Sequence, residues 1–159
     1  MVERQCAMTA AVLMFCDGLC EPVNPGGFAC WGWVAFDETG HQLAQEYGCL
    51  GHGPGMTNNR AEYTALLQAL DWATAAGHQG VHISTDSKLV VEQTNGRWNC
   101  KSPALQPLCA TAQQKLARLQ ATLSWVPREQ NTAADTLTRT AYADAQQAAT
   151  GAAGGGRYG

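Results

Sequence analysis

Four acidic residues occur where the sequence predicts the ends of buried strands or the first turns of helices. They are Asp17, Glu62, Asp86 and Asp135. Carboxylates at the ends of central strands point into the crevice beyond the sheet, where open α/β folds bind their ligands. Near a helix N-terminus the helix dipole stabilises negative charge. The four side chains are therefore expected to converge, although each acid taken alone could be a turn, cap or surface residue.

A crevice lined by four carboxylates would need a cation. At about 4 Å and an effective dielectric near 20, each like-charged pair costs roughly 4 kcal/mol. Oxygen ligands without His or Cys favour Mg²⁺ or Mn²⁺ over zinc. Two such ions can hold both the attacking and the leaving oxygen of a phosphodiester displacement. The acids therefore predict a phosphodiesterase that uses two Mg²⁺ ions, for which Mn²⁺ would substitute.

The elements that must position these acids alternate between strand and helix patterns. Strands are expected over 11–16, 28–36, 42–50, 81–85 and 123–126, and helices over about 58–76, 87–94, 103–120 and 131–145. Turn-forming segments join the first three strands, which favours an antiparallel meander. Asn58 or Asn59 is expected to cap the first long helix, Gly77 to end it, and Asn131 to cap the last helix. The order predicts an α/β domain with a mixed five-stranded sheet flanked by helices.

The composition fits one globular domain, because 45% of the 159 residues are hydrophobic and only 14% are charged. We expect a loose leader over 1–9, a domain over 10–147 and a disordered Gly/Ala-rich tail over 148–159. No run of eighteen apolar residues occurs, so no membrane span is expected. The seven cysteines form no CxxC pair, so most are expected to be reduced rather than bound to zinc. We also expect a cytoplasmic monomer that uses no small-molecule cofactor.

Four short segments resemble the acidic motifs of type 1 ribonuclease H, in that family's order and at about its spacing. They are Phe15-Cys-Asp-Gly18, Thr57-Asn-Asn-Arg-Ala-Glu-Tyr63, Ser84-Thr-Asp-Ser-Lys88 and Asn131-Thr-Ala-Ala-Asp-Thr-Leu137. The resemblance covers roughly residues 11–145 and implies the family's fold. It also implies endonucleolytic cleavage of the RNA strand of RNA/DNA hybrids, which leaves 5′-phosphate and 3′-hydroxyl ends. The four acids then take the family's metal-binding catalytic positions.

The same resemblance implies a set of substrate contacts. They are Cys20, Asn24, Thr57, Asn58, Asn59, Lys88 and Trp98. Asn24 and Thr57 would contact a phosphate of the DNA strand, and Trp98 could stack on that strand if it is not a core residue. The others would line the minor groove, where RNA 2′-hydroxyls are sensed. Lys88 departs from the glutamine that is common at its position, Cys20 could be only a buried small residue, and Asn59 could be only a helix cap.

Two features depart from many members of the family. Arg128 occupies a loop position where histidine is common, as in one branch of the family. Arginine keeps its proton and cannot be a general base, so we expect Arg128 to bind the scissile phosphate or aid product release. An exposed arginine without function is the alternative, and Glu129 could instead transfer protons. The basic protrusion of some members is missing, since residues 96–103 offer only Arg97 and Lys101; with a net charge of −3, this predicts weak, salt-sensitive binding.

Three other functions would fit the same fold. A 3′–5′ exonuclease usually has two acids one residue apart on its first strand, whereas Gly18 and Leu19 follow Asp17. An integrase-like or junction-resolving enzyme fits the segment 57–62 poorly. A non-catalytic hybrid-binding domain would keep the fold, but all four acids are present here.

Overall fold

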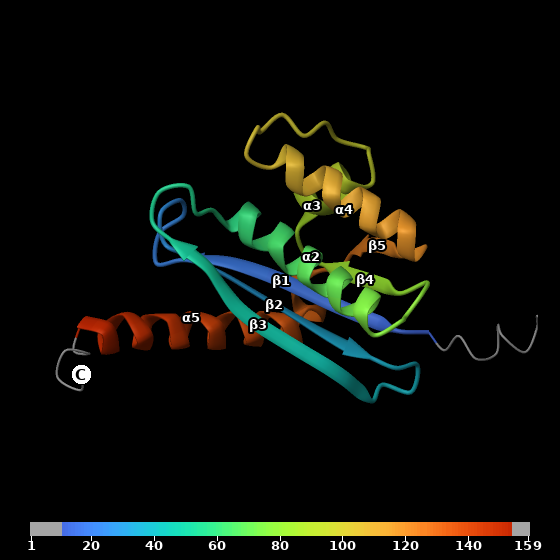
Figure 1. Cartoon of the computed structure of the whole chain (residues 1–159), viewed down its shortest axis with the longest axis horizontal. Coiled ribbons are helices and arrows are strands. Elements are labelled where there is room, and N and C mark those ends of the chain that lie inside the picture. The colour runs from blue at the N-terminus through green and yellow to red at the C-terminus, as the bar shows by residue number, and fades with distance from the viewer. Residues whose placement is uncertain (1–10, 154–159) are drawn as a thin grey trace, which may run out of the picture.

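A computed structural model describes residues 11–153 of the chain, with side chains for residues 11–150. One five-stranded sheet has the order β3-β2-β1-β4-β5. Its strands are β1 (Leu13–Glu21), β2 (Phe28–Phe36), β3 (Gln42–His52), β4 (His82–Thr85) and β5 (Thr122–Trp125). The first three strands pair antiparallel, while β4 runs parallel to β1 and β5 parallel to β4. The predicted mixed sheet is therefore confirmed (Figure 1). The predicted leader over 1–9 lies outside the described residues.

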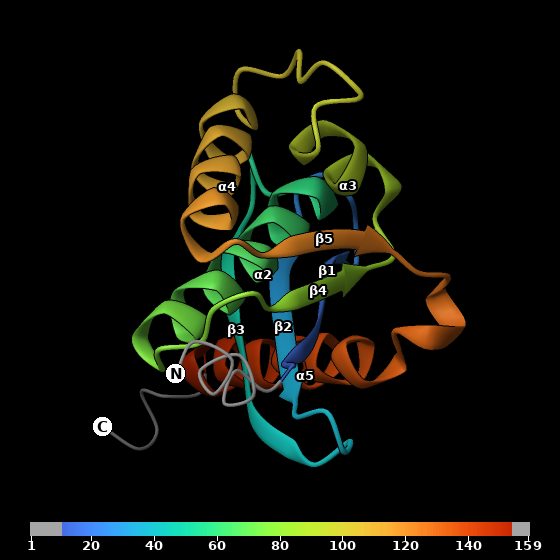
Figure 2. The same ribbon diagram turned by 90° about the vertical axis from the view of Figure 1, so that its right-hand side faces the viewer.

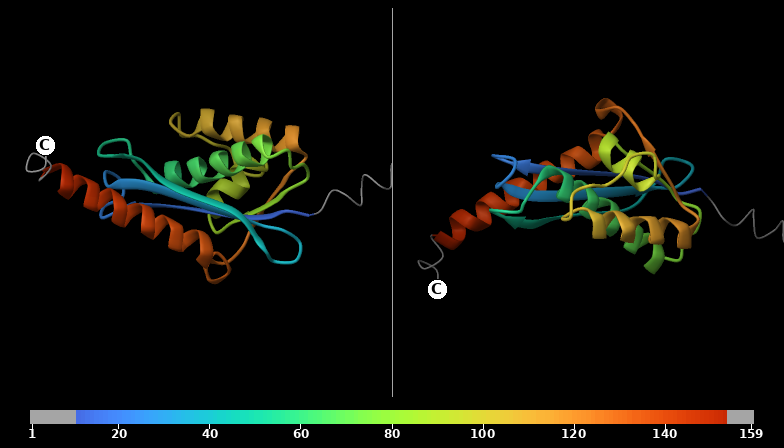
Figure 3. Two further views of the ribbon diagram at one scale, coloured as in Figure 1. Left: turned by 60° about the horizontal axis from the view of Figure 1, so that its bottom comes forward. Right: turned by 90° about the horizontal axis from the view of Figure 1, so that it is seen from above.

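Helices cover both faces of this sheet. They are α2 (Asn58–Ala75), α3 (Lys88–Thr94), α4 (Gln106–Leu119) and α5 (Thr132–Ala153), with a short 3-10 helix η1 (Arg128–Gln130) before α5. Figure 3 shows α2 and α4 on one side of the sheet and α5 on the other. Among the described helices, none combines the length and the apolar character that a membrane crossing requires.

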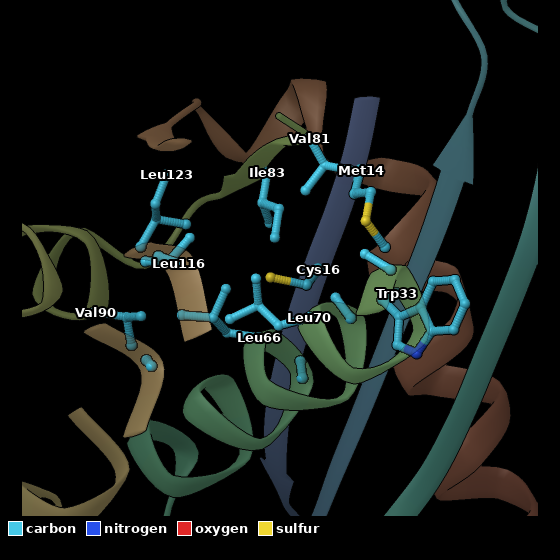
Figure 4. Close-up of a cluster of buried hydrophobic side chains, with 14 of the residues drawn as sticks. Met14, Cys16, Trp33, Leu66, Leu70, Val81, Ile83, Val90, Leu116 and Leu123 are labelled. Carbon is cyan, nitrogen blue, oxygen red and sulfur yellow. The ribbon is translucent and has the colours of Figure 1, made fainter. Parts of the chain in front are cut away.

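The main hydrophobic core lies between the sheet, α2 and α4 (Figure 4). Met14 and Cys16 of β1 point into it, and so do Leu66 and Leu70, which lie one turn apart on α2. Full burial of a leucine of this kind contributes about 1.5–3 kcal/mol. Because side chains alternate along a strand, Asp17 points to the opposite face, toward α5.

The strand expected to end at residue 16 instead continues to Glu21. Asp17 lies in its middle, opposite Gly32 of β2. Gly18 therefore lies inside the strand rather than after it, and a Cβ there would lie 2.4 Å from the backbone nitrogen of Glu62. This glycine thus allows α2 to approach β1 closely. Since β4 pairs only with residues 13–15 of β1, the sheet opens into a crevice beside Asp17.

Helix boundaries differ from the predictions in three places. Thr57, rather than Asn58 or Asn59, caps α2, since its hydroxyl accepts a hydrogen bond from the Arg60 N–H at 3.1 Å. Helix α4 begins at Gln106, and Pro103, where it was expected to begin, lies in the preceding turn. Helix α5 continues past residue 145 to Ala153, as its alanine-rich sequence favours. Residues 148–153 of the predicted tail are therefore helical, and residues 154–159 lie outside the described part.

Replacement of Gly18 by alanine should strongly destabilise the protein. The new methyl group would meet backbone atoms of α2 at 2.4–2.8 Å, and backbone cannot move aside as a side chain can. We expect the free energy of unfolding, measured in urea, to fall by about 2–4 kcal/mol. Gly51→Ala is the matched control, because its Cβ would meet only the flexible Met56 side chain, at 3.0 Å. Equal losses in the two variants would contradict the close-packing role of Gly18.

Candidate active site

Three of the four predicted acids come together at the crevice. One carboxylate oxygen each from Asp17, Glu62 and Asp86 lies within 4.8 Å of the others. The three arrive from the middle of β1, from α2 and from the residue that follows β4. Within residues 11–150, they form the only group of three or more His, Cys, Asp or Glu side chains placed to share a metal ion.

Glu62 lies further along its helix than the sequence predicted. It is the fifth residue of α2, beyond the first turn where it was predicted, and only 6% of its surface is exposed. Its Oε1 atom is buried and has no hydrogen-bond partner among the described residues. A buried oxygen without a partner is costly in free energy. A divalent cation would satisfy it, and a donor set made only of carboxylate oxygens fits Mg²⁺ or Mn²⁺.

Burial and mutual repulsion disfavour the ionised forms of these carboxyl groups. Burial, followed by the charge of Asp86, raises the pKa of Asp17 to about 8. Burial, followed by the charges of Asp17 and Asp86, raises the pKa of Glu62 well above its usual range. The pKa of Asp86 is also raised by burial, although Arg128 opposes the shift. Cation binding at this site should therefore release protons.

Asp135 lies beside the group of three rather than within it. It is in the first turn of α5 and lines the same pocket as Asp17, whose pKa its charge helps to raise. Its Oδ1 lies 3.6 Å from Nε of Arg139, one turn along the helix. Sequence reasoning missed Arg139, although the i,i+4 spacing from Asp135 was a signal for the pair.

Asn131 anchors the beginning of α5 to the sheet. Its side chain is buried, and Nδ2 donates a hydrogen bond to the backbone carbonyl of Cys16 at 2.9 Å. Asn131 directly precedes α5, as predicted, but its Oδ1 accepts no hydrogen bond from the described residues, so its side chain does not cap the helix. This long-range bond holds the acid of α5 next to the strand that carries Asp17.

Asp17, Glu62 and Asp135 line a pocket of about 260 Å³ that has polar walls. Cys20, Asn24 and Asn58, three of the predicted substrate contacts, also line this pocket. Asn24 Oδ1 accepts a hydrogen bond from the Asn58 N–H at 3.0 Å, and this bond joins the loop after β1 to the start of α2. The Cys20 side chain is buried and its Sγ lies 3.2 Å from the carbonyl oxygen of Val23, so it contributes little surface.

Other predicted substrate contacts lie elsewhere. Thr57 and Asn59 line a second groove of about 440 Å³, together with Arg60 and Lys101. Trp98 is 47% exposed, so the alternative that placed it in the core is wrong. Neither of these two hollows has Trp98 in its wall.

Two cationic side chains lie in this part of the molecule, one beside Asp86 and the other beside Trp125, the last residue of β5. Arg128 of η1 is 83% exposed, and its Nε is 3.8 Å from Oδ2 of Asp86. Lys88 Nζ lies 5.4 Å from the centre of the Trp125 ring. Trp125 was not among the predicted site residues. Its position at the end of β5, parallel to β4, was the signal that could have pointed to it (Figure 2).

The mixed sheet, with carboxylates gathered where β4 leaves β1, defines a protein of the ribonuclease H-like fold. A family profile described as reverse transcriptase-like matches residues 16–141. In sequence, the chain is 39% identical to the bifunctional protein Rv2228c of Mycobacterium tuberculosis and 35% identical to ribonuclease HI of Halobacterium salinarum. The chain belongs to the type 1 ribonuclease H family.

Solved structures agree with this assignment. The N-terminal RNase H domain of the M. tuberculosis protein superposes with a TM-score of 0.78 at 37% identity, over 88% of this chain and 99% of that one. LC11-RNase H1, solved in complex with an RNA/DNA hybrid, gives 0.76 at 30% identity, over 85% and 99% of the two chains. The sequence matches cover 79% and 77% of this chain, but only 34% of the full mycobacterial protein and 60% of the Halobacterium enzyme.

Proposed function

We propose that this chain is a metal-dependent endonuclease that hydrolyses the RNA strand of RNA/DNA hybrids. The observation that carries the proposal is the group of Asp17, Glu62 and Asp86, of which the first two are buried, with one carboxylate oxygen of each within 4.8 Å of the others. Membership of the family supports it, and so does the relative LC11-RNase H1, whose structure contains such a hybrid.

In this proposal the four acids hold two Mg²⁺ ions, and Mn²⁺ can replace them. Once bound, the cations would activate a water molecule and stabilise the leaving 3′-oxygen, so that the products carry 5′-phosphate and 3′-hydroxyl ends. The protein's own contribution is to hold the carboxylates in place before substrate arrives. The backbone packing of Glu62 on Gly18 and the bond from Asn131 to β1 do this.

Two sets of polar groups would receive the hybrid. Asn58, at the pocket wall, would meet the RNA strand and its 2′-hydroxyls, and Asn24 beside it would contact a phosphate of the DNA strand. The second groove, with Thr57 and Lys101 among its lining residues, offers hydroxyl and ammonium donors to phosphates of the DNA strand. Because the chain carries a net charge of −3, we expect its affinity to fall steeply with added salt.

Arg128→Ala should lower kcat/KM for hybrid cleavage by about tenfold. The guanidinium lies beside Asp86 and is largely exposed, so it can bind a phosphate at the cluster, and a charge-assisted hydrogen bond is worth about 1.5–3 kcal/mol. The matched control is Arg118→Ala on the exposed surface of α4, which should leave cleavage unchanged. If both variants behave like the wild type under steady-state conditions, Arg128 is only a surface residue.

The activity is tested with an RNA/DNA hybrid labelled on the RNA, incubated with Mg²⁺ or Mn²⁺ and, separately, with EDTA. Duplex RNA, duplex DNA and single strands run beside it. We expect metal-dependent internal cuts confined to the RNA of the hybrid. Cuts in DNA would identify a different nuclease of the same fold, and binding without cleavage by folded protein would identify a non-catalytic hybrid-binding domain.

A further inference from the structure

An exposed aromatic surface adjoins the carboxylate cluster on the side of β5. Trp125 is the last residue of that strand and 46% of its surface is exposed. Its only polar atom, Nε1, donates a hydrogen bond to the backbone carbonyl of Asp86 at 3.2 Å. The bond fixes the ring next to the cluster. With the indole N–H already engaged, the ring offers its apolar faces to anything that docks there.

A cation accompanies this ring. Lys88 is the first residue of α3 and is exposed, and its Nζ lies 5.4 Å from the centre of the Trp125 ring. A lysine ammonium at that distance is attracted by the ring's electron density. This contact limits the orientations of the long Lys88 side chain, so its ammonium group stays beside the Trp125 ring.

The electrostatics of the crevice require cations at this place. The crevice is lined by carboxylates and the whole chain has a net charge of −3, so a nucleic-acid backbone is repelled unless nearby cations receive its phosphates. Arg128 is one such cation beside Asp86, and Lys88 is another, on the side of Trp125.

We propose that Trp125 and Lys88 together bind the sugar–phosphate backbone of the RNA strand next to the cut. The Trp125 ring packs against a ribose and the Lys88 ammonium binds the adjoining phosphate. The inference rests on the proposed function, because it is the cluster at Asp86 that holds the RNA strand there. Lys88 then contacts a phosphate rather than the minor groove, and Trp125 is a substrate contact that the sequence did not predict.

The test is steady-state cleavage of the labelled hybrid by the full chain in Mg²⁺, at several KCl concentrations. Trp125→Leu should raise KM about fivefold, because the aromatic contact is lost. Lys88→Gln should raise KM about threefold. It should also make the negative slope of log(kcat/KM) against log[salt] shallower by about one, because one phosphate contact is lost. Trp125→Phe should stay within about twofold of wild type, and kcat should change less than twofold in all three variants.

Matched controls use another exposed aromatic residue and a distant lysine. Tyr47→Leu removes a 40% exposed ring from β3, and Lys115→Gln removes a lysine that pairs with Asp71 at 2.6 Å; neither should alter KM or the salt slope. Thermal unfolding checks that each variant is folded. If Trp125→Leu does not fold, Lys88→Gln decides the matter, because unchanged KM and salt slope in that variant would overturn the proposal.

The outcomes separate this inference from the proposed function. No cleavage by the wild type with either metal would overturn the proposed function itself. Cleavage by the wild type, with KM and salt slope unchanged in Trp125→Leu and Lys88→Gln, would overturn only the backbone contact. A fall in kcat at constant KM in Trp125→Leu and Trp125→Phe would also overturn it, because Trp125 would then act only by positioning Asp86.

Discussion

Asp86→Asn is expected to reduce cleavage of the RNA/DNA hybrid by about 10³-fold or more while the protein stays folded. Changes to residues that merely support metal ligands cost 10–100-fold, so the loss of a ligand itself should cost more. Asparagine has the shape of aspartate but one neutral oxygen in place of the shared negative charge. The Asp86 side chain is only 8% exposed and belongs to the group of three carboxylates, so water cannot simply replace it.

Asp71→Asn is the matched control for this variant. Asp71 lies on α2, its side chain is 54% exposed, and it pairs with Lys115 on the surface. Its replacement should leave cleavage within about twofold of wild type, since an exposed ion pair contributes little. Hybrid binding, measured by fluorescence anisotropy, should be kept or strengthened in Asp86→Asn, because one charge that repels phosphate is gone. Full activity of Asp86→Asn would overturn the carboxylate mechanism.

Asp17→Asn is expected to stabilise the metal-free protein at pH 8 by about 1–3 kcal/mol while it abolishes cleavage. The pKa of Asp17 in the folded protein is about 8, whereas an unperturbed aspartate has a pKa near 3.9. Between these values the folded state binds more protons than the unfolded state, so wild-type stability falls as pH rises from about 4 to about 8. Because asparagine does not ionise, Asp17→Asn lacks this loss of stability. At pH 4 the two proteins should be equally stable.

Thermal unfolding in EDTA from pH 4 to pH 8 measures this effect. One kcal/mol corresponds to about 2–4 °C in Tm for a chain of this size, so a rise of several degrees is expected at pH 8. Mg²⁺ should raise the Tm of the wild type by mass action and should have little effect on Asp17→Asn. Asp71→Asn should follow the wild type throughout. A Tm of Asp17→Asn below that of wild type at pH 8 would show that ionised Asp17 does not destabilise the metal-free protein.

Much of this protein could be predicted from local sequence patterns. Strand and helix periodicity arises from neighbouring residues, so the mixed sheet and its antiparallel first three strands followed from the order of the elements. The four acidic motifs were recognised in the same way, and the family they indicated is the one to which the chain belongs. Each of these inferences needs only a short stretch of chain.

Features that depend on distant contacts could not be predicted. The first strand was expected to end at residue 16, and only the tertiary structure shows that it continues through Gly18, where α2 approaches closely. Asn131 indicated a helix cap, but its amide bonds to a carbonyl 115 residues away. Trp125 could be placed on a strand from the sequence, but only the pairing of β5 with β4 brings it beside Asp86.

The sequence by itself determined which carboxylates are available and on which kind of element each one lies. Only the tertiary structure decided which of them share an ion-sized space: Asp17, Glu62 and Asp86 lie within 4.8 Å, while Asp135 lies beside them and pairs with Arg139. The physical reason is that strand and helix patterns are local, whereas distances between side chains depend on how a helix packs against a sheet. In this protein that packing depends on Gly18 and on the buried amide of Asn131, and the partners of both lie far along the chain.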